Sequence, residues 1–134
     1  RLGLLAEVQD ALRRHPGSAA VAVEACGALW AMSYNAANKL EAGRLGLLAE
    51  VQLALRQHHS SPPLAEKACA VVWVLCRNAE NSAEAGRLGL LAEVQGALRQ
   101  HSGSAVVTEQ ACRVLCNMCS SIDGSRSEAG RLGL

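Results

Sequence analysis

The sequence predicts an all-α fold, an α-solenoid of about three stacked helical repeats. An eight-residue phrase, Arg-Leu-Gly-Leu-Leu-Ala-Glu-Val, begins at Arg1, Arg44 and Arg87, and its first half returns at Arg131. A fixed period of this length is typical of repeat proteins, whose units stack only on their neighbours. Apolar residues also recur with helical spacing, and no segment alternates like a strand. We therefore expect one domain, with repeats over 1–43, 44–86 and 87–130 and a truncated fourth repeat beginning at 131–134.

The first long helix of the middle unit is predicted from a stripe of apolar residues. They recur at i, i+1, i+4, i+7 and i+8, which places them on one side of a helix. Polar residues close this helix, and a turn over 59–63 follows. Ser61 can cap the next helix, because a serine oxygen accepts a hydrogen bond from a free N–H at a helix start. The stripe comprises Leu47, Leu48, Val51, Ala54 and Leu55, and the serine recurs as Ser18 and Ser104.

The second long helix, over about 62–77, is apolar around most of its circumference. We expect it to be the most buried helix of the unit. Residues 78–81 interrupt it, and a short helix through Ala83 is expected to follow. Gly86 then permits the sharp turn into the next unit, since glycine tolerates unusual backbone angles. Each unit thus contains one short and two longer helices.

Composition excludes several classes of function. The 13 basic residues nearly balance the 12 acidic ones, whereas a dedicated nucleic-acid binder would show a basic stripe. No apolar run approaches the roughly 18 residues that span a bilayer, so we expect no membrane contact. The chain has no start methionine and no signal-like segment, so we expect it to begin inside a longer sequence. The expected location is the cytoplasm, with the nucleus as the alternative.

The six cysteines are predicted to be reduced thiols with a structural role. Cys26, Cys69 and Cys112 share one position of the repeat, where cysteine acts as a small buried apolar residue. The spacing of Cys112, Cys116 and Cys119 also matches the iron–sulfur motif of radical-SAM enzymes. Positions i, i+4 and i+7 form one helix stripe, however, and we favour that structural interpretation. We expect no metal and no cofactor; the sixth thiol is Cys76.

Arginine and histidine recur together at the end of the first long helix. A ladder of this kind could hold phosphates or an acidic peptide, but positive charge at a helix C-terminus also suits the helix dipole, and we favour that explanation. No nucleophile or enclosed cleft accompanies the histidines, so we do not expect an enzyme. The residues are Arg13, Arg56 and Arg99 with His15, His58 and His101.

Three phrases of the chain resemble the armadillo repeat family, which includes importin-α and β-catenin. Residues 28–34 (Ala-Leu-Trp-Ala-Met-Ser-Tyr) are similar to the third-helix motif of importin-α and of consensus armadillo proteins. Residues 41–48 resemble the family's junction between first and second helices, and residues 78–81 resemble its loop between repeats. The resemblance covers the whole chain. The related HEAT repeat lacks the short first helix.

The resemblance implies a right-handed superhelix whose third helices line a concave groove. Family members bind extended peptides there, using a tryptophan and an asparagine four residues later on each third helix. Trp30 and Trp73 match this pattern, whereas Cys116 stands at the third tryptophan position. The asparagine positions hold Tyr34, Arg77 and Ser120.

The three units differ mainly in the turn and the third helix, while the second helix barely changes. Substituted positions spaced at i, i+4 and i+7 share one face of the third helix. If third helices line a groove, the groove is the varied surface; drift at tolerant positions is the alternative explanation. The sets are Gly27, Ala70 and Arg113; Ala31, Val74 and Asn117; and Tyr34, Arg77 and Ser120.

The sequence thus predicts a protein-interaction scaffold that binds a protein, a peptide or a helix in a concave groove. The alternative is a structural or self-assembling repeat fragment, engineered or reconstructed, with no natural ligand. Neither end of the chain shows a polar capping repeat, which favours head-to-tail stacking into a homo-oligomer. The expected groove surface, with both tryptophans partly exposed, comprises Trp30, Tyr34, Trp73, Arg77, Arg113 and Asn117.

Overall fold

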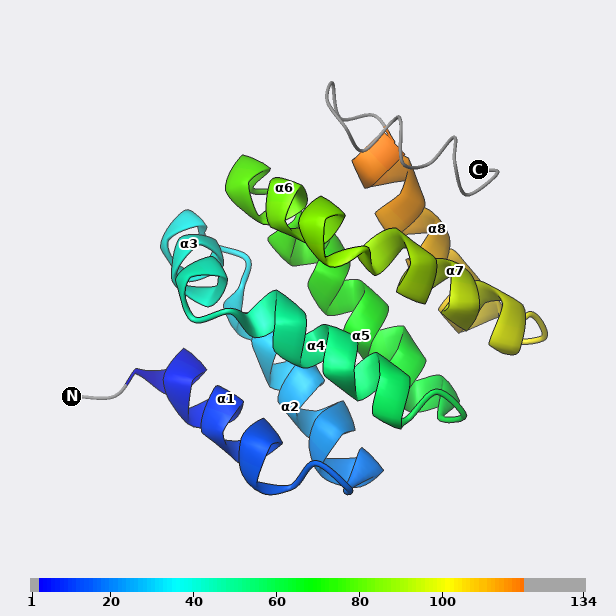
Figure 1. Ribbon diagram of the computed structural model, residues 1–134, viewed down its shortest axis with the longest axis horizontal. Coiled ribbons are helices and arrows are strands. Elements are labelled where there is room, and N and C mark those ends of the chain that lie inside the picture. Colours follow the sequence, from blue (N-terminus) through cyan, green and yellow to red (C-terminus); the bar gives the residue numbers. More distant parts are fainter. Residues whose placement is uncertain (1–2, 120–134) are drawn as a thin grey trace.

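The computed structural model describes residues 3–119, and this part of the chain is all-helical (Figure 1). It contains eight α-helices and no strand within that range, so the prediction of an all-α fold is confirmed. The fourth repeat expected at 131–134 lies outside the described residues. The helices are α1 (Leu4–Arg14), α2 (Ala19–Met32), α3 (Ala36–Arg44), α4 (Leu47–Gln57), α5 (Pro62–Leu75), α6 (Ala79–Leu88), α7 (Leu90–Gln100) and α8 (Ala105–Cys119).

The long helices form two rows. In one row α5 packs against both α2 and α8, and in the other α4 packs against α1 and α7. Within each unit the two rows meet, with α1 on α2, α4 on α5 and α7 on α8. The shorter helices α3 and α6 contact each other and lead into α4 and α7. Figure 1 shows α2, α5 and α8 following one another across the molecule.

Serine caps start the helices of the α2, α5 and α8 row, as the sequence predicts. The Oγ atom of Ser61 accepts a hydrogen bond from the Leu64 N–H at 3.2 Å, and Pro62 follows as the first helical residue. Each cap of this kind contributes about 1 kcal/mol. The equivalent bonds join Ser18 to Val21 at 3.1 Å and Ser104 to Val107 at 3.3 Å.

Two predictions about the link between units are wrong in detail. Helix α6 does not end near Ala83 but runs to Leu88, because Asn78 caps its start and the chain stays helical for ten residues. The turn into the next unit therefore lies at Gly89 rather than Gly86, which is inside the helix. Gly89 has a φ of 73° and Gly46 has a φ of 77°, a left-handed conformation that glycine adopts without strain.

The core lies between the two rows and is aliphatic. Helix α5 is the most buried of the described helices, as predicted, because it has neighbours on both sides in its own row. Nine of its twelve residues from Leu64 to Leu75 are buried. Each fully buried leucine or valine contributes about 1.5–3 kcal/mol. Within residues 3–119, no helix is long and apolar enough to cross a membrane.

Polar side chains also join successive units of the α1, α4 and α7 row. The amide of Gln9 donates to the Leu45 carbonyl at 2.6 Å, and the amide of Gln52 donates to the Leu88 carbonyl at 2.7 Å. Both glutamines are buried, so these bonds satisfy helix-end carbonyls that would otherwise lack a partner. Beside them, Arg13 pairs with Glu50 at 2.6 Å and Arg56 with Glu93 at 2.8 Å.

Candidate functional site

The α2, α5 and α8 row brings five of the six predicted groove residues to one surface, which we call the third-helix face. It comprises Trp30 and Tyr34 near the end of α2, Trp73 and Arg77 near the end of α5, and Arg113 on α8. Trp30 and Trp73 are partly buried, and the other three side chains are exposed. Because α5 packs against both neighbours, residues at one register of the repeat lie on adjacent helices.

The first aromatic cluster of the third-helix face surrounds Trp30. The Tyr34 ring meets the Trp30 ring edge to face, with centroids 5.5 Å apart and an angle of 73° between planes. The Lys67 ammonium, from the neighbouring helix α5, lies 5.8 Å from the Trp30 ring centroid. Tyr34 keeps 53% of its surface exposed. This end of the face therefore offers an aromatic edge with one cation beside it.

The second cluster surrounds Trp73 and is more strongly basic. The guanidinium carbons of Arg77 and Arg113 each lie 5.2 Å from the Trp73 ring centroid. Arg77 comes from the end of α5, while Arg113 reaches across from α8. Such cation–π contacts contribute about 0.5–1 kcal/mol at exposed sites. Arg113 also has a loose ion pair with Glu109 at 4.0 Å.

Asn117, the sixth predicted groove residue, stabilises the stack of helices. Its Nδ2 donates to the carbonyl of Cys76 at 3.1 Å, which joins α8 to the C-terminal cap of α5. Asn117 is half-buried, so this amide is directed into the molecule rather than along the third-helix face. Asn117 thus differs in role from the other five.

Lys67 belongs to the face but was not predicted from the sequence. An alignment of the repeats could have indicated it, because Lys67 occupies the position held by Glu24 in the first unit and Gln110 in the third. A reversal of charge at one position of otherwise similar units indicates that this side chain serves a local contact and not the stacking common to all units. Its contact with Trp30 crosses from one helix to the next, so spacing along a single helix could not reveal it.

The cysteines divide into buried and exposed groups. Cys26, Cys69 and Cys76 are buried and unbridged, and burial raises the pKa of each thiol to about 12. Cys112 and Cys116 are exposed, so the prediction that they are buried is wrong. Helix α8 is the last described helix of its row, and no described helix covers its outer side. The side chain of Cys119 lies outside the described residues, and no group of three metal-ligating residues occurs among those described.

Two of the three histidines of the predicted ladder, His58 and His101, also join units. Nε2 of His58 donates to the Pro16 carbonyl at 3.0 Å, and Nε2 of His101 donates to the His59 carbonyl at 2.9 Å. Arg13 and Arg56 pair with the glutamates of the following unit, as described above. These arginines and histidines therefore recur because they bond one unit to the next, in addition to the favourable effect of positive charge at a helix C-terminus.

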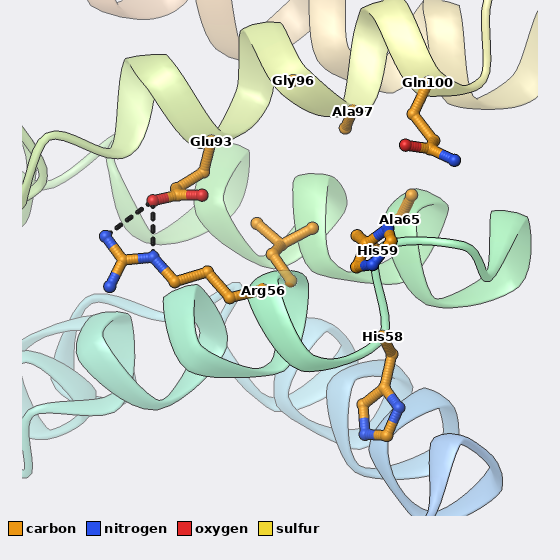
Figure 2. A pocket seen from close by; sticks show the side chains of 9 residues that line it. Arg56, His58, His59, Ala65, Glu93, Gly96, Ala97 and Gln100 are labelled. Atoms are coloured by element: carbon orange, nitrogen blue, oxygen red, sulfur yellow. Dashed lines mark hydrogen bonds and ion pairs between the residues drawn. The ribbon is translucent and has the colours of Figure 1, made fainter.

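The same junctions enclose a pair of equivalent pockets. One has a volume of about 270 Å³ and is lined by Arg56, His59, Glu93 and Gln100. Figure 2 shows the Arg56–Glu93 pair on one side of this pocket and His59 with Gln100 on the other. The corresponding pocket one unit earlier has a volume of about 160 Å³, because Leu53 stands where the larger pocket has glycine.

An apolar groove lies on the outer side of α1 and α2. Its volume is about 520 Å³, and Leu4 on its rim is 69% exposed. Most of the apolar positions one repeat later are buried where the first unit packs on the second; Leu47, the counterpart of Leu4, is fully buried. The groove lining comprises Leu4, Glu7, Val8, Ala11, Ala20, Val21, Glu24 and Ala25.

Comparisons of the chain with protein-family models, with curated proteins and with solved structures found no match. Three surfaces of the described chain can therefore bear on its function: the third-helix face, the junction pockets and the outer groove.

Proposed function

We propose that the chain is an armadillo-like solenoid that acts as a protein-interaction scaffold and binds an extended peptide along the third-helix face. The observation that carries this proposal is the gathering of exposed and partly exposed aromatic and cationic side chains from three successive helices on one surface. Aromatic residues and arginine are the side chains most enriched at the energetic centres of interfaces. The proposal includes a right-handed superhelix with this surface on its concave side.

The repeat-to-repeat contacts also support a binding role. The α1, α4 and α7 row uses its polar side chains for stacking, with Gln52, Arg56 and His58 all bonded to other units. On the third-helix face, Tyr34 and Arg77 have no hydrogen bond or ion pair through their side chains to another described residue. Side chains that do not stabilise the stack are available to a ligand.

A peptide-array screen followed by titration in solution tests the proposal. The array should contain tryptophan-free peptides of both charges, and hits should be titrated against the chain while its tryptophan emission is recorded. Trp30 and Trp73 are the two tryptophans of the chain, so the emission reports directly on the face. We expect saturable binding that Trp73→Ala weakens about tenfold or more, as for a residue at an energetic centre.

Leu53→Ala is the matched control for this experiment. Leu53 is an apolar residue with an exposed side chain, but it lies on α4, in the other row of helices. Binding that Leu53→Ala and Trp73→Ala weaken equally, with both variants folded by circular dichroism, would contradict the proposed site. Titration of the unmodified chain without any saturable hit would contradict the proposed function itself.

The second candidate function is self-assembly, and the apolar groove on α1 and α2 favours it. The equivalent surface of α4 and α5 is covered by α1 and α2 of the preceding unit. In a head-to-tail pair, α7 and α8 of a second copy would cover the groove on α1 and α2 in the same way. Head-to-tail stacking would continue the packing already present inside the chain. Light scattering over a concentration series should then show mass growth that Leu4→Glu prevents and Leu53→Glu does not. A constant monomer mass up to millimolar protein would exclude this function.

A further inference from the structure

We infer that the ligand of the third-helix face is an acidic peptide, held by Arg77 and Arg113, with an apolar or aromatic side chain against Trp30 and Tyr34. This inference depends on the proposed function and names the chemistry of the partner. A tryptophan ladder is suited to cationic side chains, because the indole face attracts positive charge. In this chain the cations that occupy the indoles belong to the protein itself.

Both indoles of the third-helix face already hold a cation from the chain itself. Lys67 lies 5.8 Å from the centroid of Trp30, and two arginines lie 5.2 Å from that of Trp73. A lysine or arginine of a ligand would have to displace these groups and would be repelled by them while approaching. The indoles therefore cannot serve a basic peptide without losing contacts that the folded chain has made.

Positive charge is in excess around Trp73. Both guanidinium carbons lie 5.2 Å from one ring centroid, so they are at most twice that distance apart. The carboxylate that pairs with Arg113 is that of Glu109, and this ion pair is long, at 4.0 Å, and exposed. No carboxylate among the described residues pairs with Arg77. A ligand carboxylate would relieve the repulsion between the two arginines and form charge-assisted hydrogen bonds.

The chain's other acidic groups on this row lie farther from Trp73. Glu66 is seven residues before Trp73 on α5, which corresponds to about 10 Å along the helix axis. Glu24 lies on α2, in the first half of that helix. The glutamates of this row thus lie in the first halves of their helices, whereas Arg77 and Arg113 gather around Trp73. An acidic ligand would bind at the end that carries Trp73.

The distance between neighbouring helices gives the spacing of the ligand motif. Packed helices lie about 8–10 Å apart, and an extended chain rises about 3.3 Å per residue. A peptide crossing from α2 to α5 would therefore advance about three residues between the Trp30 cluster and the Trp73 cluster. Trp30 and Tyr34 present an aromatic edge to one ligand side chain, while Arg77 and Arg113 receive another. We expect an aromatic or aliphatic residue three positions from an aspartate or glutamate.

Titration of a matched peptide pair tests the inference. Both peptides contain no tryptophan and carry leucine three positions from a charged residue. Every charged residue is glutamate in one peptide and lysine in the other. Single-tryptophan variants, Trp30→Phe and Trp73→Phe, assign the change in emission to one cluster. The acidic peptide should bind at least tenfold more tightly than the basic one. Its affinity should fall several-fold between about 50 and 500 mM salt, because exposed charges are screened.

Neutral and reversed charges at the arginines sharpen the test. Arg77→Gln and Arg113→Gln should each weaken the acidic peptide about tenfold, and the double variant Arg77→Glu with Arg113→Glu should favour the basic peptide. Arg44→Gln is the control, since it removes the same charge from the exposed end of α3. Circular dichroism verifies that each variant is folded.

The outcomes separate this inference from the proposed function. Tighter binding of the basic peptide, weakened by Trp73→Ala, would overturn the acidic ligand and leave the peptide-binding scaffold in place. Absence of saturable binding for both peptides and for array hits of either charge would overturn the scaffold as well. Binding of a single-stranded oligonucleotide in preference to every peptide, lost in Arg77→Gln, would show that the anionic ligand is a nucleic acid and would overturn the inference.

Discussion

The two rows of long helices differ in whether equivalent positions keep the same residue from unit to unit. In the α1, α4 and α7 row, equivalent residues make equivalent contacts: the amides of Gln9 and Gln52 reach carbonyls 36 residues later at 2.6 and 2.7 Å. In the α2, α5 and α8 row, one register holds Tyr34 in the first unit and Arg77 in the second. At these positions the first row keeps both the residue and its contact constant, whereas the second row changes the residue.

This difference shows which positions are constrained by the stacking of one unit on the next. A buried amide that serves a helix-end carbonyl has no tolerated substitute of the same shape, so Gln52 repeats Gln9. Exposed side chains at the end of a third helix, such as Tyr34 and Arg77, contact their neighbours only through a ring or a charge. They can change from one unit to the next without disturbing the stack, and the resulting variety is what a binding surface needs.

The largest expected effect concerns three cysteines at one register, Cys26, Cys69 and Cys112. Cys112 is exposed, whereas the other two are buried with pKa values raised to about 12 by desolvation. The buried thiols can react only when the structure opens, which costs several kcal/mol. We expect iodoacetamide at pH 8 to label Cys112 at least about 10³-fold faster than Cys69, as measured by mass spectrometry of pulse-labelled peptides.

Labelling in urea is the control for this prediction. In the unfolded chain all three thiols should react at similar rates, because the difference arises from folding alone. Equal rates in the folded chain would show that the junction around Cys69 opens freely, and the contrast between buried and exposed positions of the register would be lost.

The next effect tests the constant row. Gln52→Ala removes an amide that donates to the Leu88 carbonyl and to Glu93. The carbonyl then lacks its buried partner, so the free energy of unfolding should fall by about 2–3 kcal/mol. Gln57→Ala, at an exposed position of the same helix, should change it by less than about 0.5 kcal/mol. Urea unfolding followed by circular dichroism measures both, and equal losses would refute the role of Gln52.

Much of this architecture could be predicted from the sequence, because it depends on local spacing. The period, the apolar stripes and the cap at Ser61 all act within one unit or through its repetition. The errors concern longer distances: the turn is at Gly89 rather than Gly86, and Cys112 is exposed because no described helix covers it. The contact of Lys67 with Trp30 and the partners of the buried glutamines cross from unit to unit, where no spacing within a single helix applies.

A smaller effect compares a glycine between units with a glycine on α2. A Cβ at Gly43 would collide with Oδ1 of Asn81, which is buried and held by the Lys39 and Leu75 carbonyls. Gly43→Ala should therefore lower the free energy of unfolding by about 2 kcal/mol. Gly27 has open space around it, so Gly27→Ala should raise the same quantity by about 0.5–1 kcal/mol. Thermal or urea unfolding would contradict the comparison if both changes had the same sign.

The smallest effect concerns the register that holds Ser33 in the first unit and Cys76 in the second. The Ser33 hydroxyl is fully buried and has no hydrogen-bond partner among the described residues, whereas the Cys76 thiol lies 3.9 Å from the Asn81 carbonyl. A buried hydroxyl without a partner is costly, while a thiol behaves as a small apolar group. Ser33→Cys should therefore stabilise the fold by about 1 kcal/mol and raise Tm by about 4 °C. Cys76→Ser should have the opposite effect, and calorimetry showing stabilisation by both exchanges, or by neither, would mean that the two junctions do not share one packing rule.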